Sequence, residues 1–327
     1  MSHYLHMLAA VSRTFTLSIE QLPGIVRDSI ALSYLLLRVS DCLEDHETLD
    51  VERKIILLEL WDEILAGQQP ANELTRQLVD LDSNDPEVYV AQQAPDLMDF
   101  LHTFPEEIQE SIKTRVKRTT LGMARWQRQG PYVETEEEMD DYMHQVAGRV
   151  GYLITDIFAW YSPRIEARKE ALLPLAREYG LALQTVNIIR GMRKDFERGW
   201  VFVPRTFIEQ VGLTREEMFM PGNEDKAIEV VNILADKAET HLRHGLEYIA
   251  AFPMHQHRIR LACMWPLFFA VKTLALSRNN VNVLLNEVKM TRQDVKSIMR
   301  QTTLMGWSNR WLDRYYQTLS QPNEINI

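Results

Sequence analysis

Apolar residues recur every three or four positions along most of this chain, and that spacing restricts the fold more than any other feature of the sequence. Three such stripes are Ile25, Ile30, Tyr34 and Leu37; Ile56, Leu60 and Ile64; and Ile228, Val231, Leu234 and Leu242. Runs of alternating β-branched residues are nearly absent, and the best extended candidate, residues 201–203, ends at Pro204. Such a segment is too short to found a sheet. The sequence therefore predicts an all-α fold.

The sequence shows no internal boundary that would clearly divide the chain into domains. Its 13 glycines and 13 prolines are scattered, no segment is a long Ser/Gly-rich linker, and no block of sequence repeats. A length of 327 residues exceeds that of a typical single-core domain, so one large domain and two small ones both stay open. We expect a single large helical domain over residues 1–327.

The composition restricts the partners and the compartment of the protein. Lys and Arg number 36 against 46 Asp and Glu, and this acidic balance argues against nucleic acid as a partner. Cys42 and Cys263, the only cysteines, offer neither a disulfide framework nor a zinc set. The longest apolar run, Leu261–Val271, is far shorter than the roughly 20 residues that span a bilayer. We expect a cytoplasmic protein without a transmembrane segment, and transient contact with a membrane stays open.

An acidic motif follows the apolar run at residues 35–37. Asp41, Glu44 and Asp45 stand at i, i+3 and i+4, so a helix places them on one side, where they repel unless a cation bridges them. Carboxylate oxygens without His or Cys suit Mg²⁺. Arg38 and Tyr34 precede the motif on the same face, and a guanidinium grips phosphate oxygens. The motif thus indicates a metal and diphosphate site, with an ordinary exposed acidic helix end as the alternative.

Two further polar segments are less specific. On a helix over residues 184–196, Asn187, Gly191, Lys194 and Asp195 lie on one face, where they either contact metal or phosphate or form ordinary helix surface. The basic segment Lys113–Arg128 is predicted to be a solvated helix face rather than a phosphate-binding patch.

Several motifs together carry a resemblance to a known family. They are SRTF at 12–15, YLLLRVSDCLED at 34–45, YMHQVAGRVG at 142–151, LQTVNIIR at 183–190, GWVFVP at 199–204, and a block over residues 263–292. In combination, these motifs resemble those of the squalene/phytoene synthases, the head-to-head trans-isoprenyl diphosphate synthases, and more closely those of the squalene branch. The resemblance covers nearly the whole chain. The polar residues 321–327 stand where eukaryotic squalene synthases typically carry a membrane anchor, so the resemblance implies a soluble, bacterial-type member.

The resemblance implies an isoprenoid-synthase fold with a central cavity, in which two acidic motifs hold Mg²⁺ and the diphosphates of two farnesyl groups. It assigns metal binding to Asp41, Glu44, Asp45, Asn187 and Asp195, diphosphate contact to Ser12, Arg13, Tyr34, Arg38 and Arg190, and proton handling to Tyr142. The implied reaction converts two farnesyl diphosphates to presqualene diphosphate and then to squalene. NADPH as reductant is implied by the resemblance alone, through the block that ends in residues 279–289.

The second acidic motif departs from the family pattern. The family usually has DxxED where this chain has Gly191, Met192, Arg193, Lys194 and Asp195. The loss of two carboxylates weakens Mg²⁺ binding on that helix. Either Lys194 contacts the diphosphate directly, or the motif has decayed and turnover is lost. Two alternatives to squalene synthesis therefore stay open: a related enzyme with another product (hydroxysqualene, presqualene diphosphate or the ionised form of one substrate), and a non-catalytic isoprenoid-binding protein.

Overall fold

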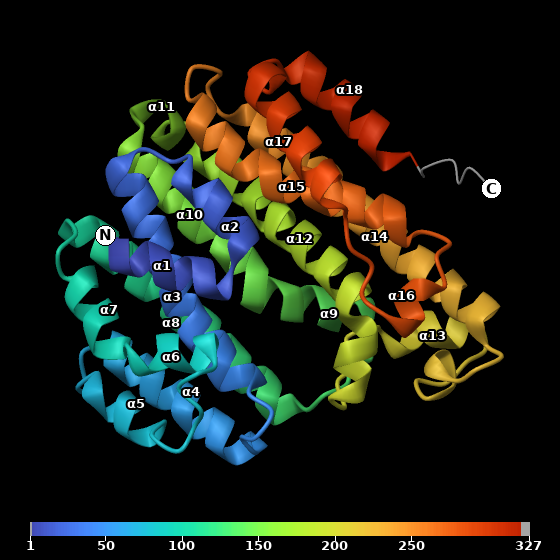
Figure 1. Ribbon diagram of the computed structural model, residues 1–327, viewed down its shortest axis with the longest axis horizontal. Coiled ribbons are helices and arrows are strands. Elements are labelled where there is room, and N and C mark those ends of the chain that lie inside the picture. The colour runs from blue at the N-terminus through green and yellow to red at the C-terminus, as the bar shows by residue number, and fades with distance from the viewer. Residues whose placement is uncertain (1, 322–327) are drawn as a thin grey trace. The chain divides into compact units, whose positions relative to one another are not determined.

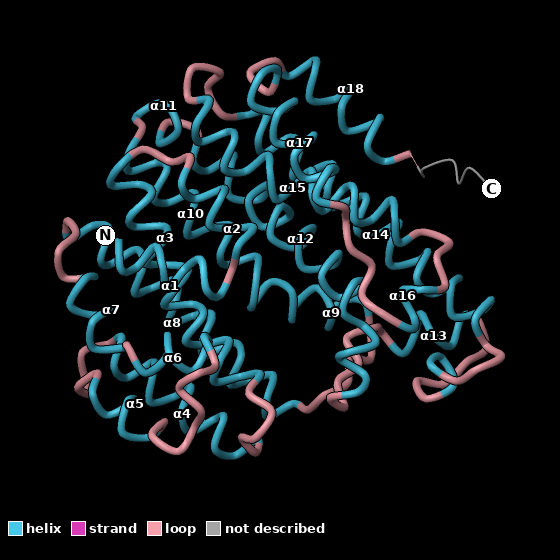
Figure 2. Tube along the Cα trace, viewed as in Figure 1, coloured by secondary structure: helices cyan, strands magenta, loops and turns pink. Residues whose placement is uncertain are grey.

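The computed structural model describes residues 2–321, apart from the side chains of Ser2 and Arg13, and this part of the chain is built from helices and loops without a strand (Figure 2). The all-α prediction is therefore confirmed. The segment expected to be extended forms only an isolated bridge between Tyr132 and Val201. The elements are α1 (Ser2–Val11), α2 (Arg13–Glu20), α3 (Gly24–Asp45), α4 (Val51–Leu65), α5 (Asn72–Gln77), α6 (Pro86–Gln92), α7 (Ala94–Leu101), α8 (Glu106–Gln129), α9 (Glu136–Met143), a π-helical turn (His144–Gly148), α10 (Arg149–Tyr161), α11 (Pro163–Glu166), α12 (Lys169–Glu197), α13 (Arg205–Gln210), a 3-10 turn (Glu217–Phe219), α14 (Glu224–Ala251), α15 (His257–Ser277), α16 (Asn282–Leu285), α17 (Arg292–Met305) and α18 (Asn309–Ser320) (Figure 1).

The helices form two compact units. Unit 1 contains the chain up to Gly130 together with Tyr152–Lys169, and unit 2 contains Pro131–Gly151 and the chain from Glu170 onward. One boundary falls inside α10 and another at the first turn of α12, so the backbone there continues as helix from one unit into the other. The expectation of a single domain over residues 1–327 stays a prediction.

Unit 1 is organised around α3. This helix packs against α1, α4, α6, α7 and α8 (Figure 1), and its leucines 32, 35 and 36 are fully buried. A buried hydrogen bond of 2.7 Å joins the hydroxyls of Ser40 on α3 and Thr120 on α8. Pairing these hydroxyls with each other avoids the cost of burying them unsatisfied. The face of α3 that bears the predicted site is therefore held on a well-packed helix.

One of the predicted apolar stripes has the wrong register. Ile56 is 56% exposed, whereas the buried face of α4 contains Leu57, Trp61 and Ile64. Four apolar residues stand in a row at positions 55–58, so spacing alone does not select the inward face. Trp61 is fully buried, and because its indole removes more apolar area from water than any aliphatic neighbour, it fixes that face. Ile25, in the first turn of α3, is also exposed.

The core of unit 2 is α15, which packs against α14, α17 and α18 (Figure 1). Within the described residues, α15 is the one helix long and apolar enough to cross a membrane by length and composition, and 89% of the apolar window is buried inside the protein. A helix that is apolar on all sides is typical of a protein interior as well as of a membrane span. The apolar run noted in the sequence thus forms the centre of unit 2.

Glycines set how closely the segment after α9 approaches α12. A Cβ atom on Gly180 of α12 would lie 2.4 Å from the carbonyl oxygen of Ala147, and one on Gly151 would lie 2.0 Å from that of Ala176. Both are backbone contacts that no side-chain rotation relieves. Gly151 and Gly180 are therefore packing requirements, since only glycine allows the two backbones to come this close.

We expect Glu178 on α12 to contribute to the acid limit of stability in unit 2. The pKa of Glu178 is lowered from 4.5 to about 2, mainly by a hydrogen bond with His241 on α14 (2.5 Å). The charges of His241 and Arg177 lower the pKa further, whereas burial acts to raise it. Because the unfolded chain binds the proton at higher pH, this stabilisation is present above about pH 4.5 and is lost as the pH falls toward about 2. Urea unfolding of Glu178→Gln between about pH 6 and about pH 3 should therefore show a weaker loss of stability than the parent protein.

The matched control is Glu170→Gln, which changes an exposed carboxylate at the start of the same helix. It should keep the pH dependence of the parent protein. Identical pH dependence in Glu178→Gln and the parent would contradict the prediction.

Candidate functional site

The second half of α3 presents one polar stripe. From residue 31 to residue 45 every position is buried except Tyr34, Arg38, Asp41 and Asp45, which stand at i, i+4, i+7 and i+11. Glu44 lies off this stripe and is only 6% exposed. Positions 44 and 45 differ by about 100° around a helix, so the packing that leaves Asp45 exposed turns Glu44 inward. The structure thus brings Tyr34, Arg38, Asp41 and Asp45 onto one face, which we call the α3 stripe, and separates Glu44 from it.

Arg38 connects the members of the α3 stripe. Its guanidinium donates to the Tyr34 hydroxyl at 2.7 Å, and one of its nitrogens lies 3.4 Å from an Asp41 oxygen. The same nitrogen donates to Glu87, on α6, at 3.2 Å. Burial would lower the pKa of Arg38, but Asp41, Tyr34 and Glu87 raise it above its ordinary value. Arg38 is therefore a fixed cation, held in place by three oxygen-bearing side chains.

The carboxyl group of Asp41 lies in an environment that disfavours its charge. Burial raises the pKa of Asp41 to about 6; Arg38 acts to lower it, and Asp45 and Glu87 raise it further. An excess of carboxylates over cations is relieved by a bound divalent cation, which favours the ionised form. Within the described residues no group of three or more His, Cys, Asp or Glu is arranged to hold a metal ion. Mg²⁺ commonly takes one or two carboxylates and completes its shell with water and substrate phosphate, and the stripe's Asp41 and Asp45 fit that pattern.

The segment 12–15 reaches the Tyr34 end of the stripe. The aromatic ring of Phe15 lies 5.5 Å from that of Tyr34. The hydroxyl of Ser12 accepts a hydrogen bond from the Phe15 backbone N–H at 3.3 Å and so caps α2. Arg13 is the first residue of α2, and its side chain lies outside the described part of the structure. The contact of Ser12 and Arg13 with a diphosphate stays a prediction.

On α12, the second predicted segment is an exposed helix face. The side chains of Asn187, Arg190 and Lys194 are exposed, while Asp195 is half-buried and pairs with Arg198 at 2.6 Å. Within the described residues Lys194 makes no ion pair. Asp195 is therefore already engaged with a cation just after the end of α12, and Lys194 supplies a positive charge to this face instead of the acid that the resemblance implies.

Arg190 is joined to the last block of the family-like sequence. Its guanidinium lies 3.0 Å from Glu287, and Lys289 lies 2.7 Å from the other oxygen of the same carboxylate. The loop between α16 and α17 thus packs beside α12. Glu287 neutralises part of the positive charge of this face. The ion pair between Glu287 and Arg190 joins residues nearly a hundred positions apart, so the local spacing of residues does not predict it.

Tyr142, at the end of α9, is 6% exposed. Its ring stacks on Phe202 with 4.5 Å between centroids, and Phe202 stacks on Trp200 in turn. The π-helical turn at residues 144–148 follows directly, a distortion that is frequent at functional sites. Trp200 and Phe202, within the motif at residues 199–204, therefore supply the aromatic surface against which the Tyr142 ring packs.

Glu87 is a residue of the site that the motifs did not reveal. It stands in the first turn of α6, directly after the capping residue Asp85 and Pro86. That pattern predicts a helix start and suits a carboxylate there, so helix capping is a sufficient local explanation for it. Its second role, as the partner of Arg38, depends on the packing of α6 against α3.

Comparison with known proteins agrees with these features. The human squalene synthase is 28% identical to this chain over 301 residues, covering 91% of this chain and 68% of the human protein. The squalene synthase of Schizosaccharomyces pombe is 29% identical over 343 residues, covering 98% of this chain and 70% of the relative. The solved structure of TcSQS in complex with the ligand BPH1237 superposes with a TM-score of 0.83 at 26% identity, covering 100% of this chain and 93% of that one.

The family comparison covers most of the chain. Residues 8–294 match the squalene/phytoene synthase family, a range that includes the α3 stripe, Tyr142 and the exposed face of α12. The expectation from the motifs is therefore confirmed at the level of family and fold. The protein belongs to the squalene/phytoene synthase family of prenyltransferases.

Proposed function

We propose that this protein condenses two molecules of farnesyl diphosphate head-to-head to presqualene diphosphate and converts that intermediate to squalene. The family and its squalene synthase members support a head-to-head prenyl condensation. The observation that carries the proposal is the α3 stripe, in which Arg38 is held between the Tyr34 hydroxyl and the carboxylates of Asp41 and Glu87. A fixed guanidinium beside paired carboxylates suits a diphosphate that binds together with a divalent cation.

The residues of the stripe would act mainly on the leaving group. Arg38 would donate hydrogen bonds to diphosphate oxygens, and Asp41 and Asp45 would hold Mg²⁺. When bound, Mg²⁺ stabilises the charge of the departing diphosphate. The Tyr34 hydroxyl, which accepts a hydrogen bond from Arg38, keeps the guanidinium in position before substrate arrives. Because these groups are ordered in advance, little reorganisation is needed when the allylic C–O bond breaks.

Tyr142 is the proposed proton-handling residue. The first half-reaction forms a carbon–carbon bond and a cyclopropane ring, and it releases one diphosphate and one proton. A phenol whose ring is fixed by stacking on Phe202 is suited to hold or pass on that proton. The second half-reaction replaces the remaining diphosphate with hydride, which requires a reductant. NADPH is the reductant that the resemblance implies.

Product analysis tests this proposal and separates it from its alternatives. The full-length protein is incubated with farnesyl diphosphate and Mg²⁺, with and without NADPH, while released diphosphate is measured and prenyl products are identified by mass spectrometry. We expect presqualene diphosphate without NADPH and squalene with it. Hydroxysqualene, or farnesol from a single ionised substrate, would instead identify a related enzyme. The absence of both diphosphate release and product would leave a non-catalytic isoprenoid-binding protein.

The altered second motif gives a separate prediction. In the double variant Gly191→Asp, Lys194→Glu we expect half-saturation at a lower Mg²⁺ concentration and an altered rate, because two carboxylates join Asp195 and one ammonium is removed. The position tolerates the change, since a Cβ atom on Gly191 would meet nothing closer than an Asp195 oxygen at 3.5 Å. Mg²⁺ titrations of diphosphate release measure the effect.

Gly191→Ala is the control for the backbone change. It should stabilise the helix by about 0.5–1 kcal/mol without changing the Mg²⁺ requirement. If the double variant keeps both the Mg²⁺ requirement and the rate of the parent, then Lys194 does not substitute for metal charge.

A further inference from the structure

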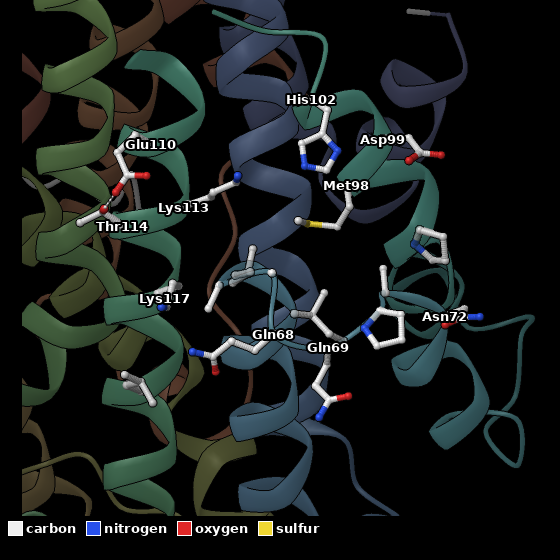
Figure 3. Close-up of a pocket in the computed structure, with 18 of the residues that line it drawn as sticks. Gln68, Gln69, Asn72, Met98, Asp99, His102, Glu110, Lys113, Thr114 and Lys117 are labelled. Atoms are coloured by element: carbon white, nitrogen blue, oxygen red, sulfur yellow. Dashed lines mark hydrogen bonds between the residues drawn. The ribbon is translucent and has the colours of Figure 1, made fainter. Parts of the chain in front are cut away.

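A groove in unit 1 has no assigned role. It lies between the end of α4 with its following turn, α7 and the first half of α8 (Figure 3), and this open groove has a volume of about 1000 Å³. None of its lining residues belongs to the α3 stripe. Figure 3 shows Lys113 and Lys117 on α8 along one wall, Met98 and His102 on the other, and Gln68 and Gln69 on the turn between them. Pockets of roughly 300–1,000 Å³ take small organic ligands.

The α8 wall of this groove is positively charged. Lys113 is half-buried and Arg118 is exposed, and neither makes an ion pair within the described part of the chain. Lys117 lies 4.0 Å from Asp62, a long contact that leaves its ammonium able to meet a second anion. Glu110 also borders the groove and reduces the positive charge of this wall; its carboxylate accepts a hydrogen bond from Thr114 on the same helix. The basic segment predicted to be a solvated face therefore lines a concavity.

The turn after α4 adds neutral hydrogen-bonding groups in a fixed position. Gly67 has a φ of +74° and donates to the Ile64 carbonyl, while the Gln68 N–H donates to the Glu63 carbonyl. This pair of bonds is the Schellman closure of a helix, which makes the turn rigid. The exposed side chains of Gln68 and Gln69 extend from this turn and line the groove, where each amide offers donors and an acceptor.

Apolar side chains complete the lining. Met98 and Pro95 of α7 and Leu121 of α8 border the same volume, and Leu121 is 45% exposed. The thioether of Met98 and the ring of Pro95 give the α7 wall an apolar surface on which a flat ring packs well. Asp99 borders the groove as well and would repel an anion placed beside it, so a negatively charged group is favoured on the α8 side.

We propose that this groove binds a nucleoside phosphate. The phosphates would lie against Lys113 and Lys117, the amides of Gln68 and Gln69 would bond to the base or ribose, and the base would pack on Met98. A volume of about 1000 Å³ exceeds what inorganic phosphate fills and suits a ligand with both a charged and a flat part. This inference does not depend on the proposed prenyl transfer, because none of the residues that line the groove belongs to the α3 stripe or to residues 279–289, the block through which the resemblance implies NADPH.

Calorimetric titration of the full-length protein tests the proposal. ADP is the probe, with EDTA present so that no divalent cation supports binding at the α3 stripe, and adenosine and inorganic pyrophosphate are titrated separately. We expect saturable ADP binding that is tighter than that of either fragment. Lys113→Gln should weaken it about tenfold or more, because one charge-assisted contact is lost.

Two further variants keep the result specific. Lys296→Gln removes an exposed lysine from α17 in unit 2, and Arg38→Gln removes the cation of the α3 stripe; both should leave ADP affinity unchanged. Hydrogen exchange should also slow in residues 66–72 when ADP is added. The proposal is overturned if ADP does not bind saturably, if pyrophosphate alone binds as tightly, or if affinity falls with Arg38→Gln and not with Lys113→Gln.

Discussion

Replacing Asp41 by asparagine should lower the rate of diphosphate release from farnesyl diphosphate by about 10²-fold or more, while the protein stays folded. The substitution keeps the size of the side chain and removes its charge. Without that charge the α3 stripe loses one of its two carboxylates, and Arg38 loses one of its acidic partners. Steady-state assays of diphosphate release, with Mg²⁺ titrated for each variant, measure the effect.

The stability of the same variant separates a functional role from a structural one. The folded protein raises the pKa of Asp41 to about 6, so the ionised form of this carboxyl group is disfavoured in the fold. The stability that the protonated group contributes at low pH is therefore lost as the pH rises through about 6. At neutral pH, Asp41→Asn should therefore have a melting temperature equal to or above that of the parent. Lost activity together with lost stability would argue for a structural role.

Asp313→Asn is the matched control for Asp41→Asn. It removes an exposed carboxylate from α18 and should change neither activity nor stability. Unchanged diphosphate release in Asp41→Asn, at all Mg²⁺ concentrations, would contradict the assignment of the α3 stripe to the diphosphate.

Replacing Arg260 by leucine should destabilise unit 2 by about 3–5 kcal/mol, the largest loss of stability that we expect from a single substitution. Arg260, on α15, is fully buried. Its guanidinium donates to the carbonyls of Ile249 and Phe252, at the end of α14, at 3.1 and 2.9 Å. It also donates to the Gly306 carbonyl and, at 2.5 Å, to the Asn309 side chain.

The expected loss follows from what leucine leaves behind. Helix ends expose carbonyls without a partner in their own helix, and Arg260 supplies donors to those at the end of α14. Leucine fills a similar part of the space but leaves several buried acceptors unsatisfied. Burial lowers the pKa of Arg260, so its removal also relieves a cost of burying charge, and the expected loss comes from the acceptors that leucine leaves unsatisfied. The free energy of unfolding of Arg260→Lys should fall between that of the parent and that of Arg260→Leu, because one ammonium cannot reach all of these oxygens.

Urea denaturation of the parent and the variants measures this prediction. Arg300→Leu, which changes an exposed arginine on α17, is the control and should shift the free energy of unfolding by less than about 0.5 kcal/mol. A loss of that small size in Arg260→Leu would show that the acceptors find water or other donors.

The sequence alone determined the helical class and the position of the polar stripe on α3. The common face of Tyr34, Arg38, Asp41 and Asp45 is predictable because a fixed angle per residue decides which side chains of one helix share a face. The sequence also placed Glu44 with them, and only packing turned that side chain inward. The register of α4 was not predictable in the same way. Its first two turns are apolar at four consecutive positions, and only burial of Trp61 selects the inward face.

The tertiary structure decided the partners of the site residues. Arg38 meets Glu87, and Arg190 meets Glu287, across 49 residues in the first case and nearly a hundred in the second. No periodicity relates residues on different helices, so these pairs arise only when the helices pack. The groove beside Lys113 also depends on packing. The sequence predicts a solvated face for this basic helix, and the groove forms only because α7 and the turn after α4 lie beside that face. The spacing of residues along one helix determines which side chains share a face. The packing of the helices determines which residues that face contacts.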